Sequence, residues 1–127
     1  MRVSLLASLV LLTTVGCSHS LLSPGSSLDG RWEWQFNRNP AGSSVSLSLT
    51  TAGSAVSGTG TICGVGPACS PGAVTITGQS TGMSIQLTIR SDSSFVATYA
   101  GLFMGPNELD GTWVEGTTSN TVIFYRK

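Results

Sequence analysis

Side chains that commonly carry out catalysis are scarce in this sequence. The single histidine, His19, lies near the N-terminus in a serine-rich stretch, and we interpret it as a solvated linker residue rather than a base or metal ligand. Without another histidine, neither a Ser–His–Asp nor a Cys–His set can be assembled. The sequence therefore predicts a protein that is not an enzyme, with no cofactor and no metal.

The carboxylates are the remaining candidates for chemistry, because two of them could form the pair that glycoside hydrolysis uses. Glu33 falls on the outward side of an alternating pattern. Asp29 and Asp110 lie in turn-like sequence, where a carboxylate usually caps backbone amides. The full set is Asp29, Glu33, Asp92, Glu108, Asp110 and Glu115. We expect no catalytic residue among them.

The first residues have the pattern of a secretory signal peptide. Arg2 gives a positive start, and residues 3–15 form a mostly apolar run that is too short to span a bilayer comfortably. The small Gly16 then precedes Cys17. This pattern predicts an exported protein.

The segment Thr14-Val15-Gly16-Cys17 resembles the lipobox of bacterial lipoproteins, although Thr14 stands where Leu is commoner. The resemblance implies that the Cys17 sulfur receives a diacylglycerol, that the signal is cleaved before it, and that the new amine is acylated. The alternative is an ordinary signal peptide, cleaved near Gly16 or Ser20. In the lipoprotein sorting rule, Asp after the cysteine retains the protein at the inner membrane. Ser18 resembles the outer-membrane class, so we expect an anchor in the outer membrane, facing the periplasm or the cell surface.

Three parts of the chain are expected on this basis. Residues 1–16 are the signal peptide, residues 17–28 are the lipidated cysteine and a Ser/Pro/Gly tether, and residues 29–127 are one β-domain. The eleven residues 18–28 can reach at most about 35–40 Å.

Cys63 and Cys69 lie in the segment CGVGPAC, between two strand-like runs. Disulfides persist outside the cytoplasm, and with Cys17 lipidated only these two thiols remain to pair. A metal site is the alternative, but two ligands without nearby His or acid are too few. We expect a Cys63–Cys69 disulfide that stiffens one loop.

The charge is low and balanced, with six basic and six acidic residues and 9% charged residues in all. Nucleic-acid binding requires a basic stripe, and polybasic membrane contact requires a cluster of Lys and Arg. The sequence offers neither. The expected partners are the membrane, through the lipid anchor, and a small apolar ligand or an envelope protein.

From Gly30 onward, apolar and polar residues alternate, with turn residues every ten or so positions, which is typical of an all-β domain. Eight strands are predicted, in residues 31–37, 44–50, 55–62, 73–78, 83–90, 94–101, 108–115 and 121–126. Short turns between consecutive strands favour an eight-stranded antiparallel up-and-down barrel, which leaves no sheet edges. A β-sandwich is the alternative.

The segment Leu28-Asp29-Gly30-Arg31-Trp32 recurs as Leu109-Asp110-Gly111-Thr112-Trp113. Both copies lead into strands that run in the same direction. We interpret LDGxW as a common way of turning the chain into the barrel wall, with coincidence in a glycine-rich chain as the alternative.

Gly30-Arg31-Trp32 together with the late Arg126 resembles the signature of the calycins, which include lipocalins and avidin-like barrels. The resemblance implies a Gly-X-Trp at the start of the first strand and a basic residue of the last strand packed across the Trp. Strand counting agrees, since the end of strand eight lies beside the start of strand one. We expect a cation–π contact between Arg126 and Trp32 that closes one barrel end.

Two functions remain open. The barrel could bind a small apolar or amphipathic ligand, in space left inside by Gly58, Gly60 and Ala97, or larger neighbours could fill that space. Alternatively, a solid barrel could act through its loops as a protein-interaction or hydrolase-inhibitor module. The apolar segment 102–106 is then either an exposed contact or a plug in the barrel end. Either way, we expect binding at the end opposite the tether, around Arg38, Asn39, Arg90, Asp92 and Glu115.

Overall fold

The computed structural model describes residues 27–35, 44–63, 72–92 and 94–127. These residues form eight strands. They are β1 (Gly30–Gln35), β2 (Ser44–Ala52), β3 (Ala55–Cys63), β4 (Gly72–Thr81), β5 (Ser84–Ser91), β6 (Val96–Gly105), β7 (Glu108–Glu115) and β8 (Thr118–Arg126). Within the described ranges, no helix is long and apolar enough to cross a membrane.

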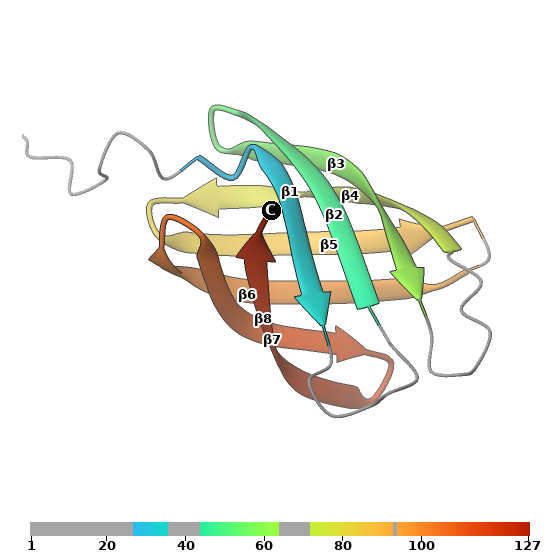
Figure 1. The fold of residues 1–127 in the computed structure, drawn as a ribbon. Helices are drawn as coiled ribbons and strands as arrows, with labels where there is room; N and C mark the ends of the chain where they lie inside the picture. The colour runs from blue at the N-terminus through green and yellow to red at the C-terminus, as the bar shows by residue number, and fades with distance from the viewer. Residues whose placement is uncertain (1–26, 36–43, 64–71, 93) are drawn as a thin grey trace, which may run out of the picture.

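Every strand is antiparallel to its neighbours, and the sheet closes on itself in the order β1 to β8 (Figure 1). The closing pair is short: Trp32 lies opposite Arg126, and Glu33 lies opposite Tyr125. The predicted up-and-down barrel is therefore confirmed, and the sandwich alternative is wrong.

Alternation of polar and apolar side chains along the strands explains why these segments form a barrel wall with an apolar interior. In β2, Val45, Leu47 and Leu49 are buried, while the residues between them face solvent to a greater degree. The same pattern recurs around the barrel. The buried apolar core includes Trp32, Leu47, Ile76, Ile85, Leu87, Ile89, Tyr99, Leu109, Trp113, Val122 and Phe124.

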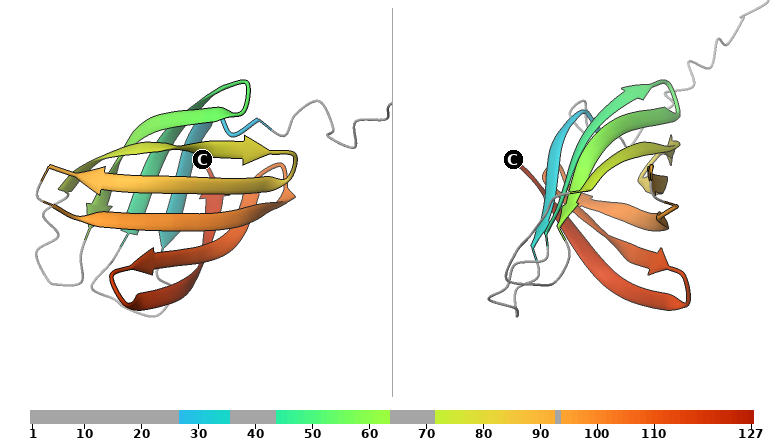
Figure 2. Two further views of the ribbon diagram at one scale, coloured as in Figure 1. Left: turned by 180° about the vertical axis from the view of Figure 1, so that it is seen from behind. Right: turned by 90° about the vertical axis from the view of Figure 1, so that its right-hand side faces the viewer.

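The barrel has two different ends. We call one the closed end: it contains the start of β1 and the turns after β2, β4 and β6 (left in Figure 1). The other, the loop end, contains the end of β1 and the turn between β7 and β8. Figure 2 shows the three closed-end turns together from behind as well, on the side where the N-terminal part of the chain enters the barrel.

The structure corrects two strand assignments. Met83 was expected on the inner face of a strand, but β5 begins at Ser84 and Met83 is exposed in the preceding turn. Residues 102–106 were expected to form a loop, but β6 continues to Gly105. Because a strand alternates, Phe103 is buried while Leu102 and Met104 are exposed, so the segment is partly plug and partly outer surface.

Candidate functional site

Trp32 and Arg126 close one end of the barrel, as predicted. The guanidinium carbon of Arg126 lies 4.4 Å from the centre of the Trp32 ring. The same guanidinium donates hydrogen bonds to the carbonyl oxygens of Ser27, Asp29 and Pro106. The Trp32 indole N–H donates to the Leu28 carbonyl oxygen at 2.8 Å. Arg126 thus ties together the chain before β1, the β6–β7 turn and the end of β8.

Other side chains complete the closed end. Leu28 and Phe103 are buried, and the Phe103 ring lies 6.2 Å from the Trp32 ring. The Asp29 carboxylate accepts hydrogen bonds from the backbone N–H and the hydroxyl of Thr51, and these bonds lower the pKa of Asp29. The capping role expected for Asp29 is confirmed. This end is filled by side chains with fixed partners and leaves little room for a ligand.

A cluster of aromatic rings occupies the interior between the two ends. Phe124 makes an edge-to-face contact with Tyr99, with ring centroids 5.1 Å apart. Trp113 lies 6.5 Å from Phe124, and Trp34 lies 6.2 Å from Trp113. The cluster therefore runs from the buried Tyr99 to Trp34, which is only partly buried.

Two glycines that face each other on neighbouring strands leave room for the Tyr99 ring. Gly101 of β6 lies opposite Gly111 of β7, and a Cβ on either would come within 2.7 Å of the Tyr99 ring. The Tyr99 hydroxyl donates to the carbonyl oxygen of Leu109 at 3.1 Å. Burial, and secondarily the charge of Asp110, raise the pKa of Tyr99. The two glycines make a slot that the ring fills.

The sequence left open whether Gly58 and Gly60 leave space inside the barrel, and the structure shows that neighbouring atoms fill it. A Cβ on Gly58 would lie 2.2 Å from the Ser48 carbonyl oxygen and 3.0 Å from a Leu49 methyl. A Cβ on Gly60 would meet the Ser46 carbonyl oxygen at 2.4 Å and a Leu47 methyl at 2.9 Å. The absent side chains let β2 approach β3 closely, and leucine methyls fill what is left.

At the loop end, three partly buried apolar side chains pack against the core: Trp34, Ile62 and Phe95. Trp34 and Ile62 lie near the loop-end limits of β1 and β3, and Phe95 directly precedes β6. All three lie in predicted strands, and the structure shows that they keep part of their surface accessible. We call these three side chains, which lie at the same end of the barrel, the apolar seat.

Two polar residues lie at the same end of the barrel as this seat. Glu115 lies opposite the buried Ala97, and Asn120 lies opposite the buried Trp113, so both are directed to the inner side of the wall by the strand register. Both are exposed. An apolar seat with a polar rim suits an amphipathic ligand.

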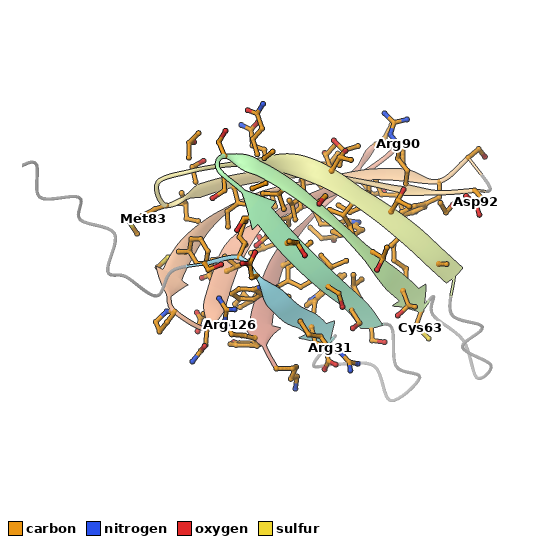
Figure 3. All side chains as sticks on the ribbon, turned by 90° about the horizontal axis from the view of Figure 1, so that it is seen from above. Arg31, Cys63, Met83, Arg90, Asp92 and Arg126 are labelled. Atoms are coloured by element: carbon orange, nitrogen blue, oxygen red, sulfur yellow. The ribbon has the colours of Figure 1, made fainter. Side chains whose placement is uncertain are left out.

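The predicted binding residues are only partly brought together. Arg90 and Asp92 do lie at the loop end (Figure 3), but Arg90 is exposed on the outer wall next to the buried Ile89. Glu115 lies at the same end, opposite the buried Ala97 in the strand register. Arg38 and Asn39 lie outside the described residues, as does Cys17.

Cys63 ends β3 at the loop end and is buried. The Cys63 sulfur has a bonding partner and is not a free thiol. Cys69 lies outside the described residues, so the Cys63–Cys69 pair stays a prediction.

Three of the remaining carboxylates, Glu33, Glu108 and Asp110, lie on the outer wall of the barrel. Glu33 lies on the outer wall, as expected, and pairs with Arg31 at 2.8 Å and Lys127 at 3.4 Å. Glu108 and Asp110 neighbour each other on the outer wall of β7, and burial together with Asp110 raises the pKa of Glu108. In the part of the chain that the structure describes, no three His, Cys, Asp or Glu side chains gather in a way that could hold a metal ion.

The two copies of LDGxW both bury their leucine and tryptophan, but their glycines lie at different places in the strands. Leu28 and Trp32, like Leu109 and Trp113, are buried core residues. Gly30, at φ 126°, starts β1, whereas Gly111 lies inside β7. The common-turn interpretation is therefore wrong, and the repeat marks only a shared inner-face spacing.

Among the residues that the structure describes, two shallow hollows lie on the outer wall, each of about 300 Å³. One is bordered by Gln86, Thr88 and Thr98, and the other by Arg31, Ser46 and Thr59. Both hollows are open to solvent, and an open hollow encloses little of a ligand's surface, which makes them weaker candidates than the loop-end seat.

No protein-family model matches this sequence, and no curated protein is significantly similar to it, so the candidate site rests on the geometry of the barrel itself.

Proposed function

We propose that this protein is a non-catalytic, lipid-anchored binding protein of the bacterial envelope that holds an apolar or amphipathic ligand at the loop end of its barrel. The observation that carries the proposal is the difference between the two ends. Trp34, Ile62 and Phe95 keep accessible apolar surface at the loop end, whereas Trp32, Phe103 and Arg126 fill the closed end.

The ligand is expected to sit on the seat rather than deep in the barrel. Tyr99, Phe124 and the leucines of β2 occupy the middle of the interior. An alkyl or aromatic group of the ligand would cover Trp34, Ile62 and Phe95, while its polar part would stay at the rim near Glu115. A shallow seat of this kind favours modest affinity and small ligands.

Two probes with the same tail test this proposal: decanoate and decyltrimethylammonium, each kept below the concentration at which it forms micelles. Binding is followed by tryptophan fluorescence. Trp34→Ala should weaken the binding of both probes by about 10–30-fold, as expected for a buried aromatic anchor. Glu115→Gln should weaken only the cationic probe, because it removes a charge at the rim.

Val114→Ala supplies the matched control, since Val114 is an exposed apolar residue on the outer wall of β7. It should leave the affinity for both probes unchanged. If Trp34→Ala bound both probes as tightly as the wild type, the loop-end seat would not be the binding site. Urea unfolding of each variant checks that the barrel remains folded.

The lipid anchor has its own test. Cys17→Ser should abolish membrane association and leave the precursor released or uncleaved. A wild-type mature protein that is freely soluble and begins at another residue would rule out the anchor while leaving the loop-end seat unaffected.

A further inference from the structure

The closed end carries exposed apolar side chains that the proposed ligand site does not use. Met83 is 58% exposed, Leu102 51% and Met104 63%. They are neighbours in space, because the backbone N–H of Phe103 donates to the Met83 carbonyl oxygen at 3.0 Å and Leu102 lies opposite Ser84. We call these three residues the closed-end patch. Figure 3 shows Met83 at the opposite end of the barrel from Arg90 and Asp92.

The turns around this patch are uncharged. Residues 52–55, 81–84 and 105–107 contain no Asp, Glu, Lys or Arg. The charged residues of the closed end, Asp29, Glu108, Asp110 and Arg126, lie beside these turns and not in them. Moving the tips of the three turns out of water therefore transfers no formal charge into an apolar medium, which is the costly step when a protein surface meets lipid.

The chain also enters the barrel at this end. Leu28 is buried there, and the Arg126 guanidinium holds the carbonyl oxygens of Ser27 and Asp29. The tether of residues 18–28 reaches at most about 35–40 Å, which is close to the length of a ten-residue strand such as β6. An anchor at Cys17 therefore joins the barrel at its closed end, and the orientation depends on what the surface of that end can contact.

We infer that the closed-end patch, Met83, Leu102 and Met104, contacts the bilayer that holds the acyl chains of Cys17, so that the loop end points away from the membrane. This inference rests on the lipid anchor proposed above. The acyl chains supply the membrane affinity, and the patch sets the orientation. The ligand seat then faces the aqueous compartment.

Two acidic residues border the patch and fit contact at the depth of the headgroups. Asp110 lies opposite Leu102, and Glu108 lies opposite Gly105. At that depth their carboxylates can meet the ammonium groups of phosphatidylethanolamine. A bilayer rich in phosphatidylethanolamine therefore matches the charge of this end better than a strongly anionic bilayer.

The methionines report on this contact directly. The sequence has three, and Met1 belongs to the predicted signal peptide, so Met83 and Met104 are the only ones left in the mature chain. An accessible thioether is oxidised to the sulfoxide by a water-soluble oxidant such as chloramine T. The lipidated protein is placed in phosphatidylethanolamine/phosphatidylcholine vesicles, and oxidation of each methionine is timed by peptide mass spectrometry.

Val96→Met supplies an internal control. Val96 is 43% exposed and lies at the opposite end of the same strand as Met104. In vesicles, Met83 and Met104 should be oxidised at least five-fold more slowly than in the soluble chain that lacks residues 1–17. The methionine at position 96 should be oxidised at the same rate in both. Flotation with the vesicles reports the anchor separately.

The outcomes distinguish the lipid anchor from the contact between the closed-end patch and the bilayer. If the protein floats with vesicles but Met83 and Met104 are oxidised equally fast in vesicles and in the soluble chain, the anchor is supported and the proposed orientation is wrong. Protein that does not float overturns the anchor and the contact together. Slow, concentration-dependent oxidation of Met83 and Met104 in the soluble chain would assign the patch to a second copy of the protein and overturn the bilayer contact.

Discussion

Arg126, on the last strand, lies with its guanidinium carbon 4.4 Å from the centre of the Trp32 ring, on the first strand. The two residues also face each other in the register of the short β1–β8 pair that closes the barrel. The side chain of Arg126 therefore reinforces the place where the sheet has the fewest paired residues.

Arg126→Lys should lower the free energy of unfolding by about 1–3 kcal/mol, because lysine cannot serve three carbonyl oxygens while covering the indole. Urea denaturation gives this value. Arg90→Lys, on the exposed outer wall, is the matched control and should change the free energy by less than about 0.5 kcal/mol. Equal effects at the two positions would show that the closed end does not depend on the guanidinium.

Gly111→Ala should destabilise the barrel by about 1–3 kcal/mol through overpacking. Its Cβ would lie 2.4 Å from the Ala100 carbonyl oxygen and 2.7 Å from the Tyr99 ring. Gly72→Ala is the control, since its Cβ would meet nothing closer than 3.9 Å. Thermal unfolding of both variants measures the difference. A Gly111→Ala protein as stable as Gly72→Ala would mean that Tyr99 does not fill the glycine slot.

Tyr99 should make the stability sensitive to alkaline pH. Its pKa is raised in the folded state from an ordinary value of 10.0, mainly by burial. The contribution of Tyr99 to the free energy of unfolding is therefore fully present below pH 10. It is lost as the pH rises above 10, because the Tyr99 hydroxyl releases its proton at lower pH in the unfolded state than in the folded state. Tyr99→Phe should lose about 0.5–1.5 kcal/mol at neutral pH with the hydrogen bond to Leu109. Its stability should then fall less steeply above pH 10 than that of the wild type, and parallel curves would contradict the assignment.

Cys63 and Cys69 should form a disulfide in protein isolated from the envelope. Mass spectrometry of non-reduced peptides should detect the linked pair. Because the loop is short, its reduction should cost only about 2–3 kcal/mol of stability. Two thiols that can be alkylated without reduction would exclude the bond.

Much of the fold could be predicted because strand alternation is a local signal. Val45, Leu47 and Leu49 alternate with serines, and the structure buries them as a row. The contact between Trp32 and Arg126 follows from strand order alone once the barrel closes. Met83 was misplaced because an apolar residue beside a turn resembles the first inward residue of a strand.

The interior was harder to predict because it depends on distances across the barrel. The sequence left open whether Gly58 and Gly60 leave space, and the structure fills these positions with the backbone of β2 and the methyls of Leu47 and Leu49. The slot for Tyr99 also requires the register that sets Gly101 against Gly111. Both are contacts between neighbouring strands, and the alternation of residues along a single strand does not predict them.

The three tryptophans test the central claim most directly, because their indole N–H groups report on both ends of the barrel. Trp32 lies at the closed end, bonded to the Leu28 carbonyl oxygen, while Trp34 and Trp113 lie toward the loop end. In a ¹H–¹⁵N NMR titration with decanoate, the indole signals of Trp34 and Trp113 should shift and that of Trp32 should stay in place. A shift confined to Trp32, or no shift of Trp34 at saturation, would contradict ligand binding at the loop end.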